Sequence, residues 1–316
     1  MKYLLSIDDT DDLTKETSTG YIACAIVKDL RANYNVKVKR GVSRHQLLLQ
    51  EGVPYTSHNS TMCIDVEGDI TIEKLFEIGK ENIFKHMAAS SDPGICVCNI
   101  DKLEDKNKLI DFGHAAKERI LTKKDAHDLA DSTPYILAEE LGGDGQGIIG
   151  AVAGVGLRLS GNDGTFRGKI HLEDDVETIS VKEIKDTYNV EDIINLRTKD
   201  SLKDDDIVSK EDPAKVFLRK GMRITFACEK KDGTYLLCSR KKALAMGKYC
   251  KFFEPDNDSN ECISTEKRCE NCLYRRFTEL GFKCDRKGFE HDLEEEENKR
   301  EKNEHGKHHR GCSANE

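Results

Sequence analysis

The first thirty residues alternate between an apolar run, a polar loop and an amphipathic segment. Residues 3–7 (YLLSI) form a short apolar run that predicts a buried β-strand. The acidic loop Asp8-Asp9-Thr10-Asp11 follows directly. Residues 18–30 then keep apolar side chains at helical spacing, and Ser18 or Thr17 is suited to cap that helix. The pattern predicts carboxylates at the carboxyl end of a strand, where α/β enzymes place their chemistry.

Strands and helices continue to alternate beyond this helix. Apolar runs predict strands at 36–42, 61–66 and 94–100, and helical periodicity marks 72–87 and 115–130. Strand, helix and strand in that order suit a ferredoxin-like or related α+β unit. A glycine-rich segment at 142–151 (GGDGQGIIGA) then leads into an apolar helix that runs through Leu159. The sequence therefore predicts an α/β (α+β) fold.

The last third of the chain has a different pattern. Short β-like runs at 222–226 and 235–238 flank the turn Lys231-Asp232-Gly233, which predicts a hairpin or part of a small barrel. The tail at 288–316 has too few apolar residues to pack, and we predict that it is disordered.

The composition also indicates the cellular compartment of the protein. The chain has 316 residues, 37% of them hydrophobic, which is enough for a sizeable core and for two or three domains. No apolar run approaches the ~20 residues of a membrane span, and the N-terminus turns acidic too soon for a signal peptide. We therefore expect a cytoplasmic protein with no membrane partner. In that reducing compartment, clustered cysteines more often hold metal than form disulfides.

Five of the 12 cysteines are grouped near the C-terminus. The spacing of Cys262, Cys269 and Cys272 resembles that of some nucleic-acid enzymes with an iron–sulfur cluster, and the last two equally suit a zinc knuckle. Unbound thiols are the alternative. The sequence predicts a zinc or iron–sulfur site with ligands among Cys250, Cys262, Cys269, Cys272 and Cys284.

The net charge of -9 conceals a local excess of basic residues. Residues 1–214 carry 27 Lys/Arg and 40 Asp/Glu, whereas 215–287 carry 18 and 10. Within the second range, 215–251 hold 11 basic and 2 acidic residues, among them Arg219 and Arg223. A basic segment on an acidic protein is typical of a polyanion partner, and a solvated surface is the alternative. We predict that 215–251 contact tRNA or another RNA.

The N-terminal pattern also predicts a phosphate site. Thr17, Ser18 and Thr19 lie at a helix start, where free N–H groups and the helix dipole favour a phosphate, opposite carboxylates that can carry Mg²⁺. The glycine-rich segment can cradle phosphates, although such a segment is more often a plain turn. His58 and Asn59 follow a Pro-Tyr pair in a loop and contact substrate or phosphate, or only cap the loop.

Five motifs in order resemble one family. They are Asp8-Asp9-Thr10-Asp11, Ser18-Thr19-Gly20-Tyr21-Ile22-Ala23, Val53-Pro54-Tyr55-Thr56-Ser57-His58-Asn59, Asp92-Pro93-Gly94 and Gly145-Gln146-Gly147-Ile148-Ile149-Gly150-Ala151. Together they are similar to the landmarks of the archaeal 2-agmatinylcytidine synthetase, which modifies a minor isoleucine tRNA. The resemblance covers residues 1–170.

The resemblance implies both a fold and a reaction. The fold is a kinase-like ATP-binding core (1–60 and 115–200) interleaved with a ferredoxin-like part (61–114), which we expect to precede a small basic β module (201–248) and a Cys-rich module (249–287). Family enzymes use ATP to phosphorylate the C2 oxygen of a tRNA cytidine, let agmatine displace that phosphate, and release AMP. By this carry-over Thr19 is the autophosphorylated threonine, Asp8, Asp9 and Asp11 hold Mg²⁺ and the triphosphate, and the nucleotide pocket includes Thr10, Thr17, Ser18, Gly145, Gly147 and Gly150.

The chain also departs from the family pattern. Ser18-Thr19-Gly20 stands where the family commonly has Cys-Thr-Thr, and 164–169 replace a basic and aromatic stretch. The family's C-terminal OB-fold and zinc ribbon, which handle tRNA, are not recognisable beyond residue 200. We therefore predict an ATP-dependent transferase that modifies an RNA with an amine, and keep two alternatives: a small-molecule kinase or ligase on the same core, and a nucleotide- and metal-binding redox regulator without catalysis.

Overall fold

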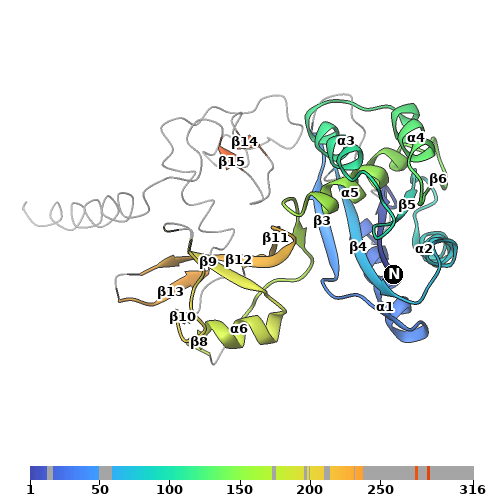
Figure 1. Cartoon of the computed structure of the whole chain (residues 1–316). Helices are drawn as coiled ribbons and strands as arrows, with labels where there is room; N and C mark the ends of the chain where they lie inside the picture. The colour runs from blue at the N-terminus through green and yellow to red at the C-terminus, as the bar shows by residue number, and fades with distance from the viewer. Residues whose placement is uncertain are drawn as a thin grey trace, which may run out of the picture.

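A computed structural model describes residues 1–12, 17–49, 59–172, 176–195, 198, 200–209, 214–230 and 232–237, together with the backbone of two short strands, β14 (Arg275–Arg276) and β15 (Lys283–Cys284) (Figure 1). The described residues form a mixed α/β fold, as the sequence predicts. None of their helices is both long enough and apolar enough to cross a membrane.

Five antiparallel strands form the part of the main sheet that contains the N-terminus. Their order is β6-β5-β1-β4-β3, so the first strand of the chain lies in the middle. In this arrangement Ser6 lies opposite both Cys63 and Cys96, and Asp8 lies opposite Gly94 at the end of the ladder. The strands are β1 (Lys2–Asp8), β3 (Val42–Gln46), β4 (Ser60–Gly68), β5 (Gly94–Asn99) and β6 (Ile136–Glu140).

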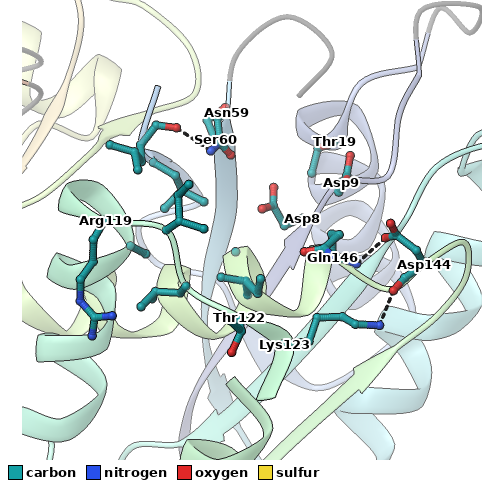
Figure 2. Close-up of a pocket in the computed structure, with 18 of the residues that line it drawn as sticks. Asp8, Asp9, Thr19, Asn59, Ser60, Arg119, Thr122, Lys123, Asp144 and Gln146 are labelled. Atoms are coloured by element: carbon teal, nitrogen blue, oxygen red, sulfur yellow. Dashed lines mark hydrogen bonds between the residues drawn. The ribbon is translucent and has the colours of Figure 1, made fainter. Parts of the chain in front are cut away.

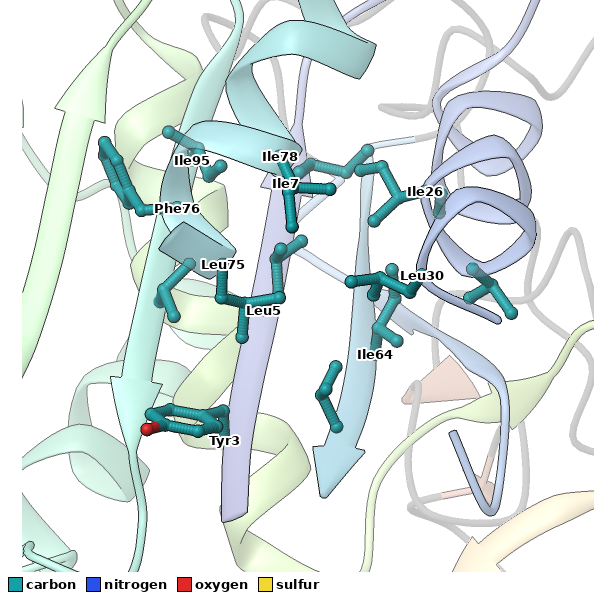
Figure 3. Packing of buried hydrophobic residues seen from close by; sticks show 14 of the residues in the cluster. Tyr3, Leu5, Ile7, Ile26, Leu30, Ile64, Leu75, Phe76, Ile78 and Ile95 are labelled. Carbon is teal, nitrogen blue, oxygen red and sulfur yellow. The ribbon is translucent and has the colours of Figure 1, made fainter. Parts of the chain in front are cut away.

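Helices cover both faces of these strands. Tyr3, Leu5 and Ile7 pack against α1 (Thr19–Asn33) and α2 (Ile72–His86), as Figure 3 shows. The other face contains a second core, to which Leu4, Cys63 and Cys96 contribute. It is covered by α3 (Asn107–Glu118), α4 (Lys123–Ser132) and α5 (Gly147–Ser160). Because β1 is buried on both faces, its sequence is a continuous apolar run rather than an alternating one.

The second half of the sheet contains the C-terminal strands. β7 (Thr165–Phe166) pairs with both β3 and β11, and so connects the two halves. The predicted hairpin is confirmed, since β12 and β13 pair antiparallel. The helix α6 (Val181–Tyr188) lies beside β8 (Figure 1). The remaining strands are β8 (Thr178–Ser180), β9 (Asp192–Asn195), β10 (Ile207–Ser209), β11 (Phe217–Arg219), β12 (Met222–Glu229) and β13 (Tyr235–Leu237).

Two predicted elements differ from the structure. The predicted strand at 36–42 is broken: β2 (Val36–Lys37) pairs with β4 and ends early, and Gly41, at φ +74°, precedes the start of β3. The predicted helix at 115–130 is two helices, because Thr122 and Asp125 form a capping box that starts α4 anew. The strands at 61–66 and 94–100, the helix at 72–87 and the apolar helix after the glycine-rich segment are confirmed.

A stacked arginine pair joins the two halves. The guanidinium groups of Arg158 and Arg223 both lie over the Phe166 ring, at 4.8 Å and 4.4 Å from its centroid. Arg40 donates two hydrogen bonds to Glu191, whose carboxylate also accepts the Arg223 N–H. We call these five residues the joint. The guanidinium of Arg223, which the sequence offered as an RNA contact, also donates to the carbonyls of Asn189 and Arg40; its RNA contact stays a prediction.

Residues 61–114, predicted as a ferredoxin-like part, place β4 and β5 in the same sheet as β1. The division into domains stays a prediction. The tail at 288–316 lies outside the described residues.

Candidate functional site

A pocket of about 580 Å³ opens at the end of β1, beside the first turns of α1 and α5 (Figure 2). Its third side is the connection between α3 and α4. The pocket brings together seven residues that the sequence singled out: Asp8, Asp9, Asp11, Thr19, Asn59, Gly147 and Gly150. Apolar wall is supplied by Leu47, Leu48, Ala116, Ile120, Leu121 and Ile149.

The acidic loop is the most polar part of this wall. Asp8 is the last residue of β1, and its carboxylate lies so close to α5 that a Cβ on Gly150 would be 1.5 Å from its Oδ2. Asp9 has a φ of +51°, in the left-handed region, which turns the chain out of the strand. The short apolar strand followed by small polar residues thus delivers two consecutive carboxyl groups to the pocket.

Both carboxyl groups have raised pKa values. Burial, assisted by the charge of Asp9, raises the pKa of Asp8 well above its usual value. Burial also raises the pKa of Asp9 to about 7, and the nearby carboxylates of Asp92, Asp11 and Asp144 add to the shift. A cluster of like charges that the surrounding groups do not neutralise favours the binding of a cation.

The start of α1 shows which residue caps the helix and which hydroxyl is left to face the acidic loop. Ser18 is the N-cap, since its side chain accepts a hydrogen bond from the Tyr21 N–H. Thr19, the next residue, donates its hydroxyl to Asp11 Oδ1 at 3.3 Å and its N–H to Asp11 Oδ2 at 3.4 Å. Thr19 is therefore not needed as a cap, and its hydroxyl contacts a carboxylate on the pocket wall.

Helix α5 reaches the pocket because its first turn is made of small residues. The Gly147 N–H donates to the Asp92 carbonyl at 2.9 Å, and a Cβ on Gly147 would lie 2.4 Å from that same oxygen. One turn on, Gly150 lies against Asp8. Only glycine permits this approach, which brings the positive end of the α5 dipole beside the acidic loop.

The N–H groups of this first turn do not form an open cradle for phosphates. Those of Ile148 and Ile149 donate to the carbonyls of Gly145 and Gln146, and that of Gly147 is bonded to Asp92. The contribution of α5 to an anion is thus its dipole rather than these three donors.

The basic side of the pocket was not predicted from the sequence. Arg119 follows α3, and Lys123 and Lys124 begin α4; all three line the wall. Figure 2 shows Arg119 on the side away from Asp9, whereas Lys123 extends toward Asp144. The sequence does contain a signal for this basic side. Lys123 and Lys124 lie between Thr122 and Asp125, the two residues of the capping box, so both belong to the first turn of a new helix.

Asp144 and Gln146 were also missed as individual residues. Both line the pocket, within the segment that the sequence marked only for its glycines. The Asp144 carboxylate accepts the Gln146 N–H at 3.2 Å, and its charge adds to the raised pKa of Asp9.

Other predicted nucleotide contacts lie beside the pocket rather than on its wall. Thr10 is buried, and within the described residues its hydroxyl has no hydrogen-bond partner. Thr17 donates its hydroxyl to the His86 carbonyl at 3.1 Å, which ties α1 to the end of α2. Gly145 and the cap Ser18 are likewise absent from the lining. The predicted roles of these residues stay predictions.

The predicted substrate pair is only half described. Asn59 lines the pocket, and its side-chain N–H donates to the Leu48 carbonyl at 2.7 Å. Its own carbonyl accepts the Leu47 N–H at 2.8 Å, so Asn59 closes the base of the β3–β4 connection. His58 lies outside the described residues.

The fit of the pocket to Mg²⁺ depends on the nucleotide. In the described part of the chain, no three His, Cys, Asp or Glu side chains are grouped as a metal site. Mg²⁺ is nevertheless often held by one or two carboxylates and completed by substrate phosphates and water. Asp8 and Asp9 offer that donor set at the end of β1, where both line the pocket.

The predicted zinc or iron–sulfur site falls outside the described residues. Cys250, Cys262, Cys269 and Cys272 are not described, and of Cys284 only the backbone is. This metal site stays a prediction.

Comparison with known proteins gave structural neighbours only. No protein-family model matches the sequence, and no curated protein matches it. A TiaS–tRNA–ATP complex has 22% identity and a TM-score of 0.44 over 58% of this chain and 43% of its own. A TiaS–tRNA–AMPCPP–agmatine complex has 22% identity and a TM-score of 0.43 over the same shares. Apo TiaS, named as a tRNA agmatidine synthetase, has 21% identity and a TM-score of 0.41 over 56% and 37%.

These solved proteins carry the name of the synthetase family that the N-terminal motifs resemble. The present chain spans less than half of their length. We therefore base the function on the residues of the pocket.

Proposed function

We propose that this protein is an ATP-dependent phosphoryl-transfer enzyme whose nucleotide binds in the pocket at the end of β1. The observation that carries the proposal is the hydrogen bond from the Thr19 hydroxyl to Asp11, in a pocket that also holds Asp8 and Asp9. A hydroxyl paired with a carboxylate is the arrangement of an activated nucleophile. Two further carboxylates with raised pKa values are suited to a metal-bound triphosphate.

The residues divide the work of the transfer. The Thr19 oxygen would form the new bond to phosphorus, its proton would pass to Asp11, and the leaving oxygen of the nucleotide would keep the electrons of the broken bond. The dipoles of α1 and α5 would stabilise the phosphates, and Lys123 adds a basic side chain to the same pocket wall. A Mg²⁺ ion bound to Asp8 and Asp9 would neutralise charge on the triphosphate.

The acceptor we propose is an RNA, a tRNA cytidine that is finally joined to an amine. Support comes from the motifs of residues 1–170 and from the basic segment 215–251. Within that segment, Arg223 also takes part in the joint, where its N–H donates to Glu191. Residues 238–251 lie outside the described residues. The solved proteins similar to this chain are named as complexes with tRNA, ATP and agmatine.

The test is a transfer assay with ATP labelled on its γ-phosphate, with Mg²⁺, with and without total tRNA. We expect label on the protein, and turnover that tRNA stimulates and that salt suppresses steeply between 50 and 200 mM, as a phosphate-contacting protein requires (roughly 10³-fold for six contacts). If the protein is labelled but tRNA has no effect, the small-molecule kinase or ligase is the better assignment. If the nucleotide binds but no phosphoryl group is transferred, the non-catalytic regulator is the better assignment. If the nucleotide does not bind, the proposal is wrong.

A further inference from the structure

Two adjacent glutamates at the end of β6 form ion pairs on opposite faces of the sheet. Glu139 pairs with Lys80 of α2 at 2.9 Å, on one face of the sheet. Glu140 pairs on the other face with two residues of α4, Lys123 at 3.0 Å and His127 at 2.6 Å. The chain thus offers a matched pair of ion-paired carboxylates, only one of which lies on the side of the pocket.

The Glu140 carboxylate also supports the glycine-rich segment. Gly145 passes so close to it that a Cβ there would lie 1.9 Å from Glu140 Oε2, and Gly145 has a φ of +77°. The Lys123 ammonium, held by Glu140, donates a second hydrogen bond to the Asp144 carbonyl, drawn as a dashed line in Figure 2. Residues 142–147, which we call the glycine loop, therefore rest on Glu140 both directly and through Lys123.

Asp92 holds the same loop from the opposite side. Its carboxylate accepts the Asp144 N–H at 2.5 Å, and its carbonyl accepts the Gly147 N–H at 2.9 Å. Both backbone groups of Asp144 are thus fixed, one by Asp92 and one by Lys123. The Asp144 carboxylate accepts the Gln146 N–H at 3.2 Å on the pocket wall, and the first turn of α5 begins three residues after Asp144.

We propose that Glu140 is a positioning residue for the nucleotide site, which holds the glycine loop through Lys123 and Gly145 and so places Asp144 and the start of α5. The inference rests on the proposed function, because the ligand is Mg²⁺–ATP. Glu140 itself does not line the pocket. Residues that act through others in this way typically change metal affinity or activity by ~10–100-fold when replaced.

The experiment compares Glu140→Gln with Glu139→Gln in the full chain. Lys123 and His127 contact different oxygens of the carboxylate, whereas the amide has only one oxygen and no negative charge, so in this geometry it can accept from only one of the two. We expect Glu140→Gln to raise the Kd of Mg²⁺–ATP, measured by calorimetry, by about tenfold or more, with KM following Kd. We expect kcat to stay within about threefold, because Thr19 and Asp11 are untouched. Glu139→Gln should leave Kd within about twofold, since among the described residues the ion pairs of Lys80 are with Glu139 and Glu77 rather than with the loop.

A second pair of variants guards against misfolding. Lys123→Met should raise Kd as Glu140→Gln does, and Lys123→Arg should restore much of the affinity, because its guanidinium can still bridge a carboxylate and a carbonyl. Equal thermal melting of the two glutamate variants with unequal Kd supports positioning. If wild type binds Mg²⁺–ATP and both Glu140→Gln and Lys123→Met bind it equally well, positioning by Glu140 is wrong. If wild type itself does not bind, the proposed function fails instead.

Discussion

The pocket and the joint are both rich in charged side chains, yet the chain treats them differently. In the joint, burial alone would raise the pKa of Glu191, but hydrogen bonds from Arg40 and from the Arg223 N–H lower it. In the pocket, burial and neighbouring carboxylates raise the pKa of Asp8 and of Asp9. One region supplies its own countercharge, whereas in the other the proposed Mg²⁺–ATP would supply it.

This difference separates structural from functional charge in physical terms. A carboxylate with its cation in place makes the fold more stable when it ionises, and a carboxylate among other carboxylates makes it less stable. The folded chain tolerates the second arrangement only where other interactions outweigh it. Neutralising a carboxylate should therefore have effects of opposite sign on stability in the two regions, and only substitutions in the pocket should change catalysis.

The largest expected effect is on turnover at Thr19. Thr19→Asn keeps a polar side chain of similar size at the start of α1 but has no alcohol to accept a phosphoryl group. We expect turnover to fall by roughly 10³-fold or more, as loss of a nucleophile does, with Mg²⁺–ATP still bound. A single-turnover assay with labelled ATP and calorimetry on the same sample measure both quantities.

A matched substitution elsewhere isolates this role. Thr71 caps α2 by accepting the Lys74 N–H at 3.2 Å, far from the pocket lining. Thr71→Asn should fold and turn over normally, because Asn caps about as well as Thr. Near-normal turnover in Thr19→Asn would show that the hydroxyl relay is not the mechanism of this protein.

The next effect concerns the contact between α5 and the acidic loop. Gly150→Ala places a methyl group 1.5 Å from the present position of Asp8 Oδ2, so the buried carboxylate must move. We expect the affinity for Mg²⁺–ATP to fall by about 100-fold and stability to fall by about 1–3 kcal/mol. The control is Gly142→Ala, whose methyl group would meet Pro93 at an ordinary 3.5 Å and should cost little or nothing. Equal affinities in the two variants would mean that the Asp8 carboxylate does not contact the ligand.

A smaller effect, of reversed sign, is expected at Asp9. Its folded pKa of about 7 lies above the ordinary value of 3.8, so its ionisation opposes folding as pH rises toward 7. Asp9→Asn removes that penalty. Three pH units correspond to about 4 kcal/mol, and partial solvation reduces this, so we expect a gain of about 2 kcal/mol at pH 8 without nucleotide.

Denaturant titration at two pH values checks this expectation. Well below pH 3.8 the carboxyl is protonated in the folded and unfolded chain alike, so the two proteins should be equally stable there. Addition of Mg²⁺–ATP at pH 8 should stabilise wild type more than the variant, because the ligand supplies the missing charge. A variant that is less stable than wild type at pH 8 would contradict the contrast between pocket and joint.

The two regions also differ in how much of them the sequence could predict. The pocket carboxylates and Thr19 were found because they are local: a strand end and a helix start a few residues apart bring them together. Lys123 and Asp144 were missed because only the pairing of β6 with β5 places α4 beside the glycine loop. The joint could not be predicted, since Arg40 and Glu191 are distant in sequence and nothing in either local pattern indicates their pairing.

The smallest expected effect is at Glu191, on the structural side of the comparison. Its folded pKa lies below the ordinary value of 4.5, so its stabilising contribution is present above that value and is lost as pH falls through the folded pKa. Because Arg40 and Glu191 are each about one third exposed, solvent weakens their ion pair, and Glu191→Gln should cost only about 1 kcal/mol at pH 7. The cost should shrink as pH falls and disappear at a pH low enough to protonate Glu191 in the folded and unfolded chain alike. Glu177→Gln, at an exposed carboxylate of the same half with no ion pair among the described residues, is the control and should change stability at neither pH. Denaturant titrations give the free energy of unfolding of each protein, and calorimetry with Mg²⁺–ATP should return the wild-type affinity for both. A loss of nucleotide affinity in Glu191→Gln would mean that the joint and the pocket are coupled and that their charges do not serve separate purposes.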